Sequence, residues 1–320
     1  MTDPVEVSVI VPAFNAGPWI GEQLQALAAQ VDAPTLEVLV CDNGSTDGTA
    51  SAVGGFDAPF PLRVVDASEA RGASHARNVG AVAAQGEVLA FCDADDLVGE
   101  HWARALTEAV RSAPDLIAAG ALHHERFNSG EVLRAYGIGP DPEVARPGAQ
   151  PLDRPRGFAG YLPTVAGGNF AIRRQDYLRI RGMDSSYPGG SEETDFAWRA
   201  QDQGMRVVGV PAAVVDYRLK SGARAIFRQQ RIQQRGRMLL WVRFARQMDG
   251  PSTKASVLAI VSQMRHLPAA AGSRARRLEM ARVVGGHVGA LEGMARYRLL
   301  SRVPARALMA DDRDRGRARG

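Results

Sequence analysis

The residues best suited to chemistry are three carboxylates within four positions, Asp93, Asp95 and Asp96, which directly follow the apolar run 86–91. That run predicts a buried β-strand, so the acids would emerge at its carboxyl end, where open α/β sheets bind ligands. Neighbouring carboxylates repel one another unless a cation or a polar ligand balances them. Oxygen ligands favour Mg²⁺ or Mn²⁺, ions that usually bind phosphates as well as protein. The alternative interpretation is a strand end followed by a helix N-cap.

The elements that must position these acids alternate between strand and helix over the first hundred residues. This order predicts a mostly parallel, Rossmann-like α/β sheet with helices on both faces. Further helices and strands are predicted up to residue 215, whereas residues 128–163 read as a long loop, lid or insertion. The expected strands are 5–14, 36–41, 62–65, 87–91, 116–122, 167–173 and 206–215, and the expected helices are 18–29, 73–84, 101–112 and 192–203.

Composition is that of a soluble globular protein, because hydrophobic residues make up 45% and charged residues 23% of the 320 positions. No apolar run reaches the length that spans a bilayer, and the first residues lack the basic and apolar regions of a signal peptide. Cys41 and Cys92 both fall in predicted buried strands, which favours a reducing compartment over a disulfide framework. We therefore expect a cytoplasmic protein.

The net charge is +4, and arginines dominate after residue 218. This asymmetry favours an anionic partner such as a diphosphate or a membrane surface. Nucleic acid is not expected, because no helix-turn-helix, zinc-finger spacing or RNP-type motif is present. From residue 223 to 310 the pattern is helical, and its apolar positions leave open packing on the preceding domain, homodimer formation or peripheral contact with the inner face of a membrane. Residues 311–320 predict a disordered tail.

Several ordered motifs resemble those of the family 2 glycosyltransferases, which have the GT-A fold. The motifs are VIVPAFN at 9–15, CDNGSTDGT at 41–49, RG at 71–72 with ARNVG at 76–80, and DADD at 93–96. The resemblance runs from about residue 7 to 237. It implies a GT-A catalytic domain over 1–222, with a nucleotide-sugar half at about 1–100 and an acceptor half at about 101–222, followed by the helical region.

The resemblance also implies which residues bind the sugar-nucleotide donor. Asp42 would accept the N3–H of uracil or thymine, which favours UDP or dTDP; the alternative for this residue is an Asx-turn. Arg77 would contact the diphosphate or sugar, or else be a solvated helix charge. Asp93 would face the ribose or sugar. The implied donor-binding set is Pro12, Phe14, Asn15, Asp42, Arg71, Arg77 and Asp93.

A divalent cation, Mn²⁺ or Mg²⁺, follows from the same resemblance. Asp95 would ligate the ion that bridges the two phosphates and neutralises charge on the departing diphosphate. Asp216 stands where relatives often carry a histidine that can complete the metal shell. An aspartate can serve there as well, although Asp216 can equally be the end of a strand.

The acceptor site would comprise Gly168 and Asn169, in the strand beneath it, and the pair Glu192 and Glu193. The family usually reads Glu-Asp here, with the aspartate as general base, so Glu193 holds the base position. It would take a proton from the acceptor hydroxyl as that oxygen attacks the anomeric carbon opposite the diphosphate, and a single displacement inverts the configuration. The alternative is that both glutamates are ordinary first-turn residues of a helix.

These observations predict a metal-dependent inverting glycosyltransferase that moves a sugar from a nucleoside-diphosphate sugar to an unidentified hydroxyl acceptor. A catalytically silent sugar-nucleotide-binding protein on the same scaffold remains the main alternative, because the usual base and metal positions are changed. A sugar-1-phosphate nucleotidyltransferase is disfavoured. Such enzymes place a Gly-rich loop with Arg and Lys after the first strand, where this chain has PAFN at 12–15.

Overall fold

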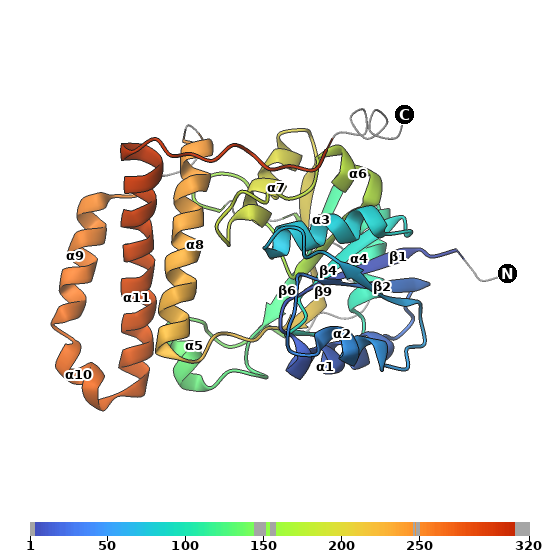
Figure 1. Cartoon of the computed structure of the whole chain (residues 1–320), viewed down its shortest axis with the longest axis horizontal. Helices are drawn as coiled ribbons and strands as arrows, with labels where there is room; N and C mark the ends of the chain where they lie inside the picture. Colours follow the sequence, from blue (N-terminus) through green and yellow to red (C-terminus); the bar gives the residue numbers. More distant parts are fainter. Residues whose placement is uncertain (1–3, 144–151, 154–157, 246, 248–249, 311–320) are drawn as a thin grey trace.

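The computed structural model describes residues 4–143, 152–153, 158–245, 247 and 250–310. The tail 311–320, for which disorder is predicted, and most of the stretch 144–157 lie outside the described residues. Within the described chain a single mixed sheet is flanked by helices, and a row of C-terminal helices stands beside it (Figure 1).

The sheet contains nine described strands, which include two groups of parallel strands. The first four strands of the chain run parallel in the order β3-β2-β1-β4, and β6 is parallel to β9. The strand β8 separates these two groups and is antiparallel to both of its neighbours, β4 and β6. Two short strands, β5 and β7, pair with β9. In order across the sheet the strands are β3 (Leu62–Asp66), β2 (Leu36–Asp42), β1 (Val7–Ala13), β4 (Val88–Cys92), β8 (Asn169–Arg173), β6 (Leu116–His123), β9 (Arg206–Asp216) and β5 (Leu97–Val98), and β7 (Leu152–Asp153) also pairs with β9.

Helices cover both faces of the sheet because successive strand residues are buried in opposite directions. On β1, Val7, Val9 and Val11 pack into the core under α1, α2 and α4, while Ile10 packs under α3, α6 and α7. The first group comprises α1 (Gly17–Ala28), α2 (Thr49–Gly54) and α4 (Trp102–Arg111). The second group comprises α3 (Ala73–Ala83), α6 (Arg174–Arg179) and α7 (Glu192–Gln201).

In the C-terminal region the helices α8 and α11 run parallel, and α11 packs backbone to backbone on α8 (Figure 1). Glycines recur every fourth residue of α11, at Gly285, Gly289 and Gly293. A Cβ atom at Gly289 would lie 2.1 Å from the carbonyl oxygen of Arg231 in α8, so no larger residue fits there. Among the described residues, no helix combines the length and apolarity needed to cross a membrane. The region comprises α8 (Ala223–Arg243), α9 (Thr253–Met264), α10 (Leu267–Gly272), α11 (Arg274–Gly293) and a π-helical turn (Met294–Leu299).

The predicted α/β sheet with helices on both faces and a helical C-terminal region is confirmed. The loop predicted over 128–163 is wrong in part, because α5 (Gly130–Tyr136) lies within it. This helix is short, and its buried residues Val132 and Ala135 pack against Ile226 of α8 and Leu278 of α11. Its stability therefore depends on partners about 90 and 140 positions further along the chain, which a local pattern does not register.

Candidate active site

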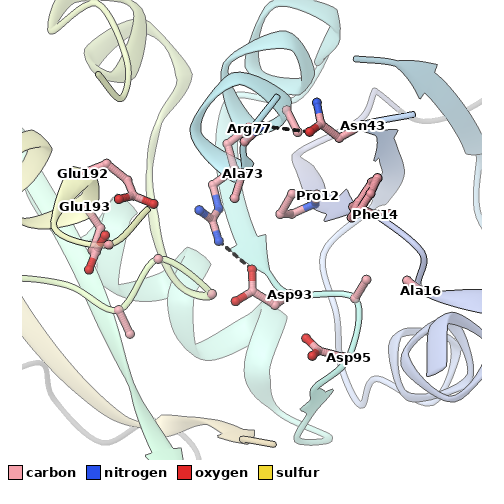
Figure 2. Close-up of a pocket in the computed structure, with 18 of the residues that line it drawn as sticks. Pro12, Phe14, Ala16, Asn43, Ala73, Arg77, Asp93, Asp95, Glu192 and Glu193 are labelled. Atoms are coloured by element: carbon pink, nitrogen blue, oxygen red, sulfur yellow. Dashed lines mark hydrogen bonds and ion pairs between the residues drawn. The ribbon is translucent and has the colours of Figure 1, made fainter. Parts of the chain in front are cut away.

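A cavity of about 690 Å³ opens at the carboxyl ends of β1 and β4 and reaches across to α7 and α8 (Figure 2). Its position matches the sheet edge at which ligands of open α/β sheets bind. The described residues that line it include four carboxylates and three cations. The charged lining residues are Asp93, Asp95, Glu192, Glu193, Arg71, Arg77 and Lys220.

The acidic turn after β4 is anchored from three sides. Arg77 donates from Nη2 to Oδ1 of Asp93 at 2.5 Å, and the buried Gln23 donates to the carbonyl of Asp93 at 2.9 Å. On the third side, a Cβ atom at Gly168 would lie only 2.5 Å from Oδ2 of Asp93. The glycine at 168 therefore leaves room for the Asp93 carboxylate in its observed position.

The two following acids differ in burial and partners. Asp95 is partly exposed at the cavity, with its carboxylate 3.4 Å from Nζ of Lys220. Asp96 is buried and accepts a hydrogen bond from the backbone N–H of Arg218 at 2.8 Å. Burial, followed by the negative charge of Asp93, raises the pKa of Asp96 to about 8. Asp96 thus ties the acidic turn to the segment after β9, and Asp95 is the acid presented to a ligand.

Arg77 lies at the centre of the cavity on α3. Its side chain is only 5% exposed, which rules out the interpretation of a solvated helix charge. Burial lowers the pKa of Arg77, but the carboxylates of Asp93, Glu192 and Glu193 outweigh this and hold the pKa above its usual value. The guanidinium is therefore a fixed positive charge between the two groups of acids.

The amino end of α3 also opens onto the cavity, through Gly72, Ala73 and Ala76. Gly72, at φ +124°, turns the chain into the helix. Small side chains at this end leave the first-turn N–H groups accessible, and these groups together with the helix dipole favour anions such as phosphates.

The opposite end of the cavity is formed by the start of α7. Gly189, Gly190 and Ser191 all have positive φ, at 116°, 83° and 75°, which directs the chain over the cavity before the helix begins. For Ser191 this is an uncommon conformation that the surrounding structure must hold. The turn presents Glu192 and Glu193 side by side at the helix amino end (Figure 2).

Both glutamates have perturbed acidity. Burial raises the pKa of Glu192, whose Oε2 atom is buried without a hydrogen-bond partner among the described residues. Burial and then the neighbouring Glu192 carboxylate raise the pKa of Glu193 to about 8, while Arg77 acts in the opposite direction. Two adjacent carboxylates with raised pKa values in a cavity are typical of a proton-transfer site.

The C-terminal helix α8 closes this end of the cavity. A Cβ atom at Gly236 of α8 would lie 2.2 Å from the carbonyl oxygen of Gly190, so the helix touches the turn before α7 directly. One turn earlier, Gln233 reaches the cavity lining. The helical region is therefore part of the site and not a separate appendage.

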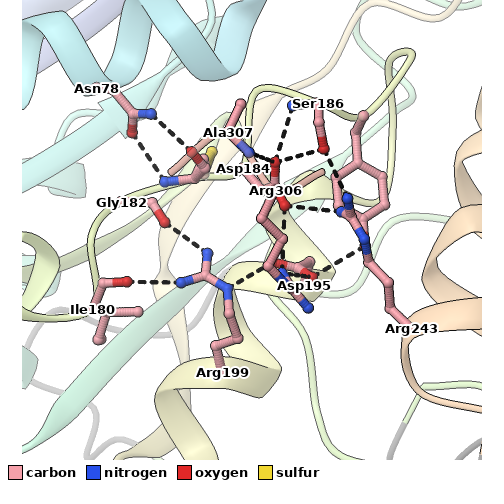
Figure 3. Close-up of polar contacts among 12 residues, drawn as sticks. Asn78, Ile180, Gly182, Asp184, Ser186, Asp195, Arg199, Arg243, Arg306 and Ala307 are labelled. Carbon is pink, nitrogen blue, oxygen red and sulfur yellow. Dashed lines mark hydrogen bonds and ion pairs between the residues drawn. The ribbon is translucent and has the colours of Figure 1, made fainter. Parts of the chain in front are cut away.

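A buried polar network holds α7 in place (Figure 3). Asp195, two residues after Glu193, is fully buried. Arg199, one turn further along the same helix, donates from Nε to its Oδ2 at 2.7 Å. Arg306, far along the chain, donates to Oδ1 of Asp195 at 2.6 Å, and the hydroxyl of Tyr187 donates to the same oxygen at 3.1 Å.

A second buried carboxylate, Asp184, extends the network to the C-terminal segment. It accepts hydrogen bonds from Nη1 of Arg243 at 2.8 Å and from the backbone N–H of Ala307 at 2.9 Å. The C-terminal segment also exchanges backbone hydrogen bonds with the loop before α7, through Ser185 to Ala307 at 3.0 Å and Met309 to Arg181 at 3.1 Å. The helix α7, which carries the two glutamates, is thus held in place by Arg306 and Ala307, more than a hundred positions further along the chain.

The predicted donor-binding residues of the first turn lie together at one end of the cavity. Pro12, Phe14, Asn15 and Arg71 all line it. Phe14 is exposed, and the guanidinium carbon of Arg71 lies 5.6 Å from its ring centroid. Asn15 has a positive φ of 52°, and its side-chain oxygen accepts a hydrogen bond from the N–H of Thr46 at 2.8 Å. An exposed ring beside a cation offers a stacking surface for a base.

Asn169, predicted to bind the acceptor, does not line the cavity. It is fully buried, and its amide oxygen accepts a hydrogen bond from the indole N–H of Trp102 at 2.8 Å. Its amide nitrogen donates to the carbonyls of Ala121 and Ala213. Asn169 therefore joins β8 to β6 and β9, which corrects the prediction of a direct acceptor contact. Gly168, its neighbour, does line the cavity.

Asp42 and Asp216 also lie outside the cavity lining. Asp42 accepts a hydrogen bond from the N–H of Ser45 at 3.0 Å, as the Asx-turn interpretation expects. Asp216 forms an ion pair with Arg126 at 3.1 Å. The predicted roles of Asp42 in base recognition and of Asp216 as a metal ligand stay predictions.

Several lining residues were missed in the sequence. Asn43 is one: its amide donates to the carbonyls of Ala67 and Ala70, and its oxygen accepts from the N–H of Gly72 at 2.8 Å, so it positions the start of α3. Asn43 lies inside a motif quoted above and could have been found there. Others come from separate elements without a motif of their own, among them Trp19, Leu122, Tyr217 and Gln233.

The acids present fit a cation that is shared with a ligand. Among the described residues, no group of three or more His, Cys, Asp or Glu side chains is arranged to hold a metal ion. Mg²⁺ and its analogues are commonly held by one or two carboxylates together with substrate phosphates. Asp95, partly exposed at the cavity, offers such a carboxylate, and the amino end of α3 offers a place for the phosphates.

Two family models match the sequence. The model described as glycosyl transferase family 2 matches residues 8–180, and one described as the N-terminal domain of galactosyltransferase matches residues 156–220. Together the two matches include every lining residue except Gln233.

Similar curated proteins include the uncharacterized glycosyltransferase YfnE of Bacillus subtilis, which is 33% identical over 130 residues, or 38% of this chain and 33% of YfnE. The validoxylamine A glucosyltransferase of Streptomyces hygroscopicus subsp. limoneus is 29% identical over 223 residues, or 62% of this chain and 48% of that protein. The chain therefore spans between a third and a half of the lengths of these relatives.

Solved structures share the fold. The mannosyltransferase PcManGT from Pyrobaculum calidifontis, in complex with GDP-Man and Mn²⁺, has a TM-score of 0.60 at 21% identity and covers 92% of this chain and 89% of its own. Residues 1–349 of S. aureus TarS, in complex with UDP-GlcNAc, have a TM-score of 0.55 at 16% identity over 92% of each chain. The predicted GT-A type of fold is confirmed.

Proposed function

Because the chain belongs to glycosyl transferase family 2, we propose that it transfers a sugar from a nucleoside-diphosphate sugar to an acceptor hydroxyl by a single, inverting displacement. The donor lies between the first turn and the start of α3, the acceptor lies against α7, and Glu193 is the general base. The acceptor itself is a hydroxyl compound of a class that we leave open.

The observation that carries this proposal is the division of the cavity into two ends. Pro12, Phe14 and Asn43 lie on one side of the Arg77–Asp93 pair, and Glu192 and Glu193 lie on the other (Figure 2). A displacement with inversion needs this layout, because the nucleophile and its base must approach the anomeric carbon from the face opposite the leaving diphosphate.

Glu193 acts on the acceptor hydroxyl. As a carboxylate it removes the hydroxyl proton while the acceptor oxygen forms a bond to the anomeric carbon and the bond from that carbon to the diphosphate breaks. Its pKa near 8 makes it a stronger base than an ordinary glutamate at the same pH, once ionised. Arg77, charged and centrally placed, orients the donor and offsets negative charge beside both glutamates.

A divalent cation, Mn²⁺ or Mg²⁺, would be held by Asp95 together with the donor phosphates and, when bound, would neutralise charge on the departing diphosphate. Lys220, 3.4 Å from Asp95, and Arg71 add positive charge at the same end. The amino end of α3 adds backbone N–H donors.

UDP or dTDP is the proposed leaving group. The basis is Asp42, at the end of β2, which binds Ser45 N–H through Oδ1. Its second oxygen remains to accept the N3–H of a pyrimidine base. The exposed ring of Phe14, beside Arg71, would stack on that base.

Thermal unfolding tests the donor end. We expect UDP or dTDP to raise the melting temperature only when Mn²⁺ is present, because a ligand that binds the native state alone stabilises it. GDP and CDP should give smaller shifts. Asp95→Ala should abolish the Mn²⁺-dependent shift, and the control Asp57→Ala, which removes an exposed acid outside the cavity lining, should retain it. A rise in melting temperature that depends on neither Mn²⁺ nor Asp95 would contradict the proposed donor site.

Turnover separates an enzyme from a silent binding protein. Water can stand in for the acceptor, so release of nucleoside diphosphate is measured with a panel of UDP- and dTDP-sugars, and proton NMR follows the anomer that forms first. We expect the inverted anomer, and a loss of about 10²–10⁴-fold in rate in Glu193→Gln. Glu69→Gln, at an exposed position, is the control. Nucleotide binding without any turnover would favour the silent scaffold, and a retained anomer would refute the single displacement.

A further inference from the structure

The helix α9 carries an unpartnered apolar surface at the edge of the molecule. Of the large hydrophobic side chains that are exposed in the described residues, a run of five falls within only eleven positions, in α9 and at the first residue of α10. No other described stretch of that length carries as many. The five are Val257, Leu258, Val261, Met264 and Leu267.

The α9 members of this run share one face with two cations. Lys254, Leu258, Val261 and Arg265 are spaced by four, three and four residues, which places them along one stripe of a helix. We call Lys254, Val257, Leu258, Val261, Met264 and Arg265 the α9 stripe. The other side of α9 faces α11, where the buried Ser256 lies 3.3 Å from Nδ1 of His287.

The α9 stripe faces away from the rest of the described molecule. In Figure 1, α9 is the outermost helix of the C-terminal row, with α11 between it and α8. The described chain ends far from it, because Ala307 and Met309 are bonded to the loop before α7. No described segment of this chain therefore covers the stripe.

The charged residues of this region indicate what kind of surface covers the α9 stripe. Residues 250–278 contain no aspartate or glutamate, and they contain five cations. Three of the five have partners: Arg274 pairs with Glu131, Arg276 pairs with Glu279, and Arg277 donates to backbone carbonyls.

The remaining two cations, Lys254 and Arg265, are exposed, and within the described residues neither has an ion-pair partner. They are the two ends of the stripe, so an apolar row is bracketed by unpaired positive charges. A partner surface must therefore be apolar in its middle and negative around it.

We propose that the α9 stripe docks on an anionic lipid surface. Apolar side chains of an interfacial helix enter the boundary between headgroups and acyl chains, and flanking lysines and arginines bind anionic headgroups. A second copy of this chain fits less well. Antiparallel pairing of two stripes would set Lys254 against Arg265, and parallel pairing would set each cation against its own copy; like charges meet in both cases, with no acid nearby to compensate.

Vesicle sedimentation of the full chain tests this proposal. The probes are vesicles of phosphatidylcholine alone and of an equimolar mixture with phosphatidylglycerol. We expect binding to the mixed vesicles that falls at high salt, and little binding to phosphatidylcholine. Each cation near an anionic surface contributes about 1 kcal/mol, so Lys254→Gln/Arg265→Gln should weaken partition roughly 30-fold.

The apolar part has its own variant and matched controls. Leu258→Gln/Val261→Gln should abolish binding to the mixed vesicles. The apolar control is Val64→Gln/Val82→Gln, which alters two side chains of similar exposure on other elements, and the charge control is Arg134→Gln/Arg302→Gln. Both controls should bind like the original chain, and the melting temperature of each variant verifies that it folds.

Three outcomes would overturn the proposal. The first is that the original chain does not bind the mixed vesicles. The second is that the stripe variants bind as well as the controls. The third is a dimer, seen by sedimentation velocity without lipid, that only the stripe variants convert to monomers; a second copy would then be the occupant. All three outcomes are independent of the proposed sugar transfer, because vesicle sedimentation and sedimentation velocity involve neither turnover nor nucleotide.

Discussion

The pH dependence of turnover offers the sharpest test of the glutamate pair. The structure raises the pKa of Glu193 from its usual value near 4.5 to about 8, chiefly by burial and then by the adjacent Glu192 carboxylate. The base form therefore predominates only above this pH. At pH 6.5 roughly 3% of the enzyme carries ionised Glu193, so kcat/KM should rise about tenfold per pH unit below 8 and level off above it.

The Glu192→Gln variant tests the cause of the shift. It removes a negative charge beside Glu193 and keeps nearly the same side-chain shape. Because that charge is the second largest contribution that raises the pKa of Glu193, the rising limb should move to lower pH. Burial remains, so the limb should stay above the value of an ordinary glutamate.

The assay is donor hydrolysis with water as the acceptor, and kcat/KM is the right parameter because it reports ionisation in the free enzyme. Glu193→Gln should remove the limb together with most of the rate, and Glu69→Gln should leave the limb in place. A flat profile between pH 6 and 9 would refute the reasoning. So would a limb near pH 4.5, or a limb that moves to higher pH in Glu192→Gln.

Three further predictions concern the supports of the site. Gly168→Ala should displace the Arg77–Asp93 pair and lower turnover, whereas Gly139→Ala, whose new Cβ meets no atom within 4 Å, should have little effect on nucleoside diphosphate release. Arg306→Ala should lower kcat while the UDP-induced rise in melting temperature persists, because it loosens α7 and not the donor end; a loss of both would contradict this division. Gly289→Ala should cost about 1–3 kcal/mol in urea unfolding through overpacking, while Gly286→Ala, in the same helix with ordinary contact distance, should be neutral or stabilising.

The sheet and the donor end could be predicted from the sequence because their signals are local. Apolar runs such as 36–41 are short, β-branched and bounded by turn residues, so they indicate strands without reference to the rest of the chain. The motif at 9–15 ends one such strand and the motif at 93–96 follows another, so the parallel order of these strands brings them to one edge. Pro12, Asp93 and Asp95 do line one cavity. The family resemblance is confirmed on the same residues.

Other parts of the site could not be predicted in this way, because the same residue type can either line the cavity or support the structure around it. Asn169 stands beside two glycines in a motif, but its side-chain amide already forms hydrogen bonds with Trp102 and with backbone carbonyls of β6 and β9. Arg77 and Arg224 both read as arginines on helices, and only packing decides that Arg77 is buried among carboxylates.

The sequence by itself determined the fold class, the family and the placement of the acidic turn, since each follows from residues adjacent in the chain. Tertiary structure alone decided what closes the cavity and what holds the base. Gln233 and Gly236 meet the turn before α7, and Arg306 reaches Asp195 across 111 positions. The physical reason is that burial and ion pairing depend on which distant segments pack together. The residues beside a helical glycine or arginine in the sequence do not indicate which distant residue it will contact.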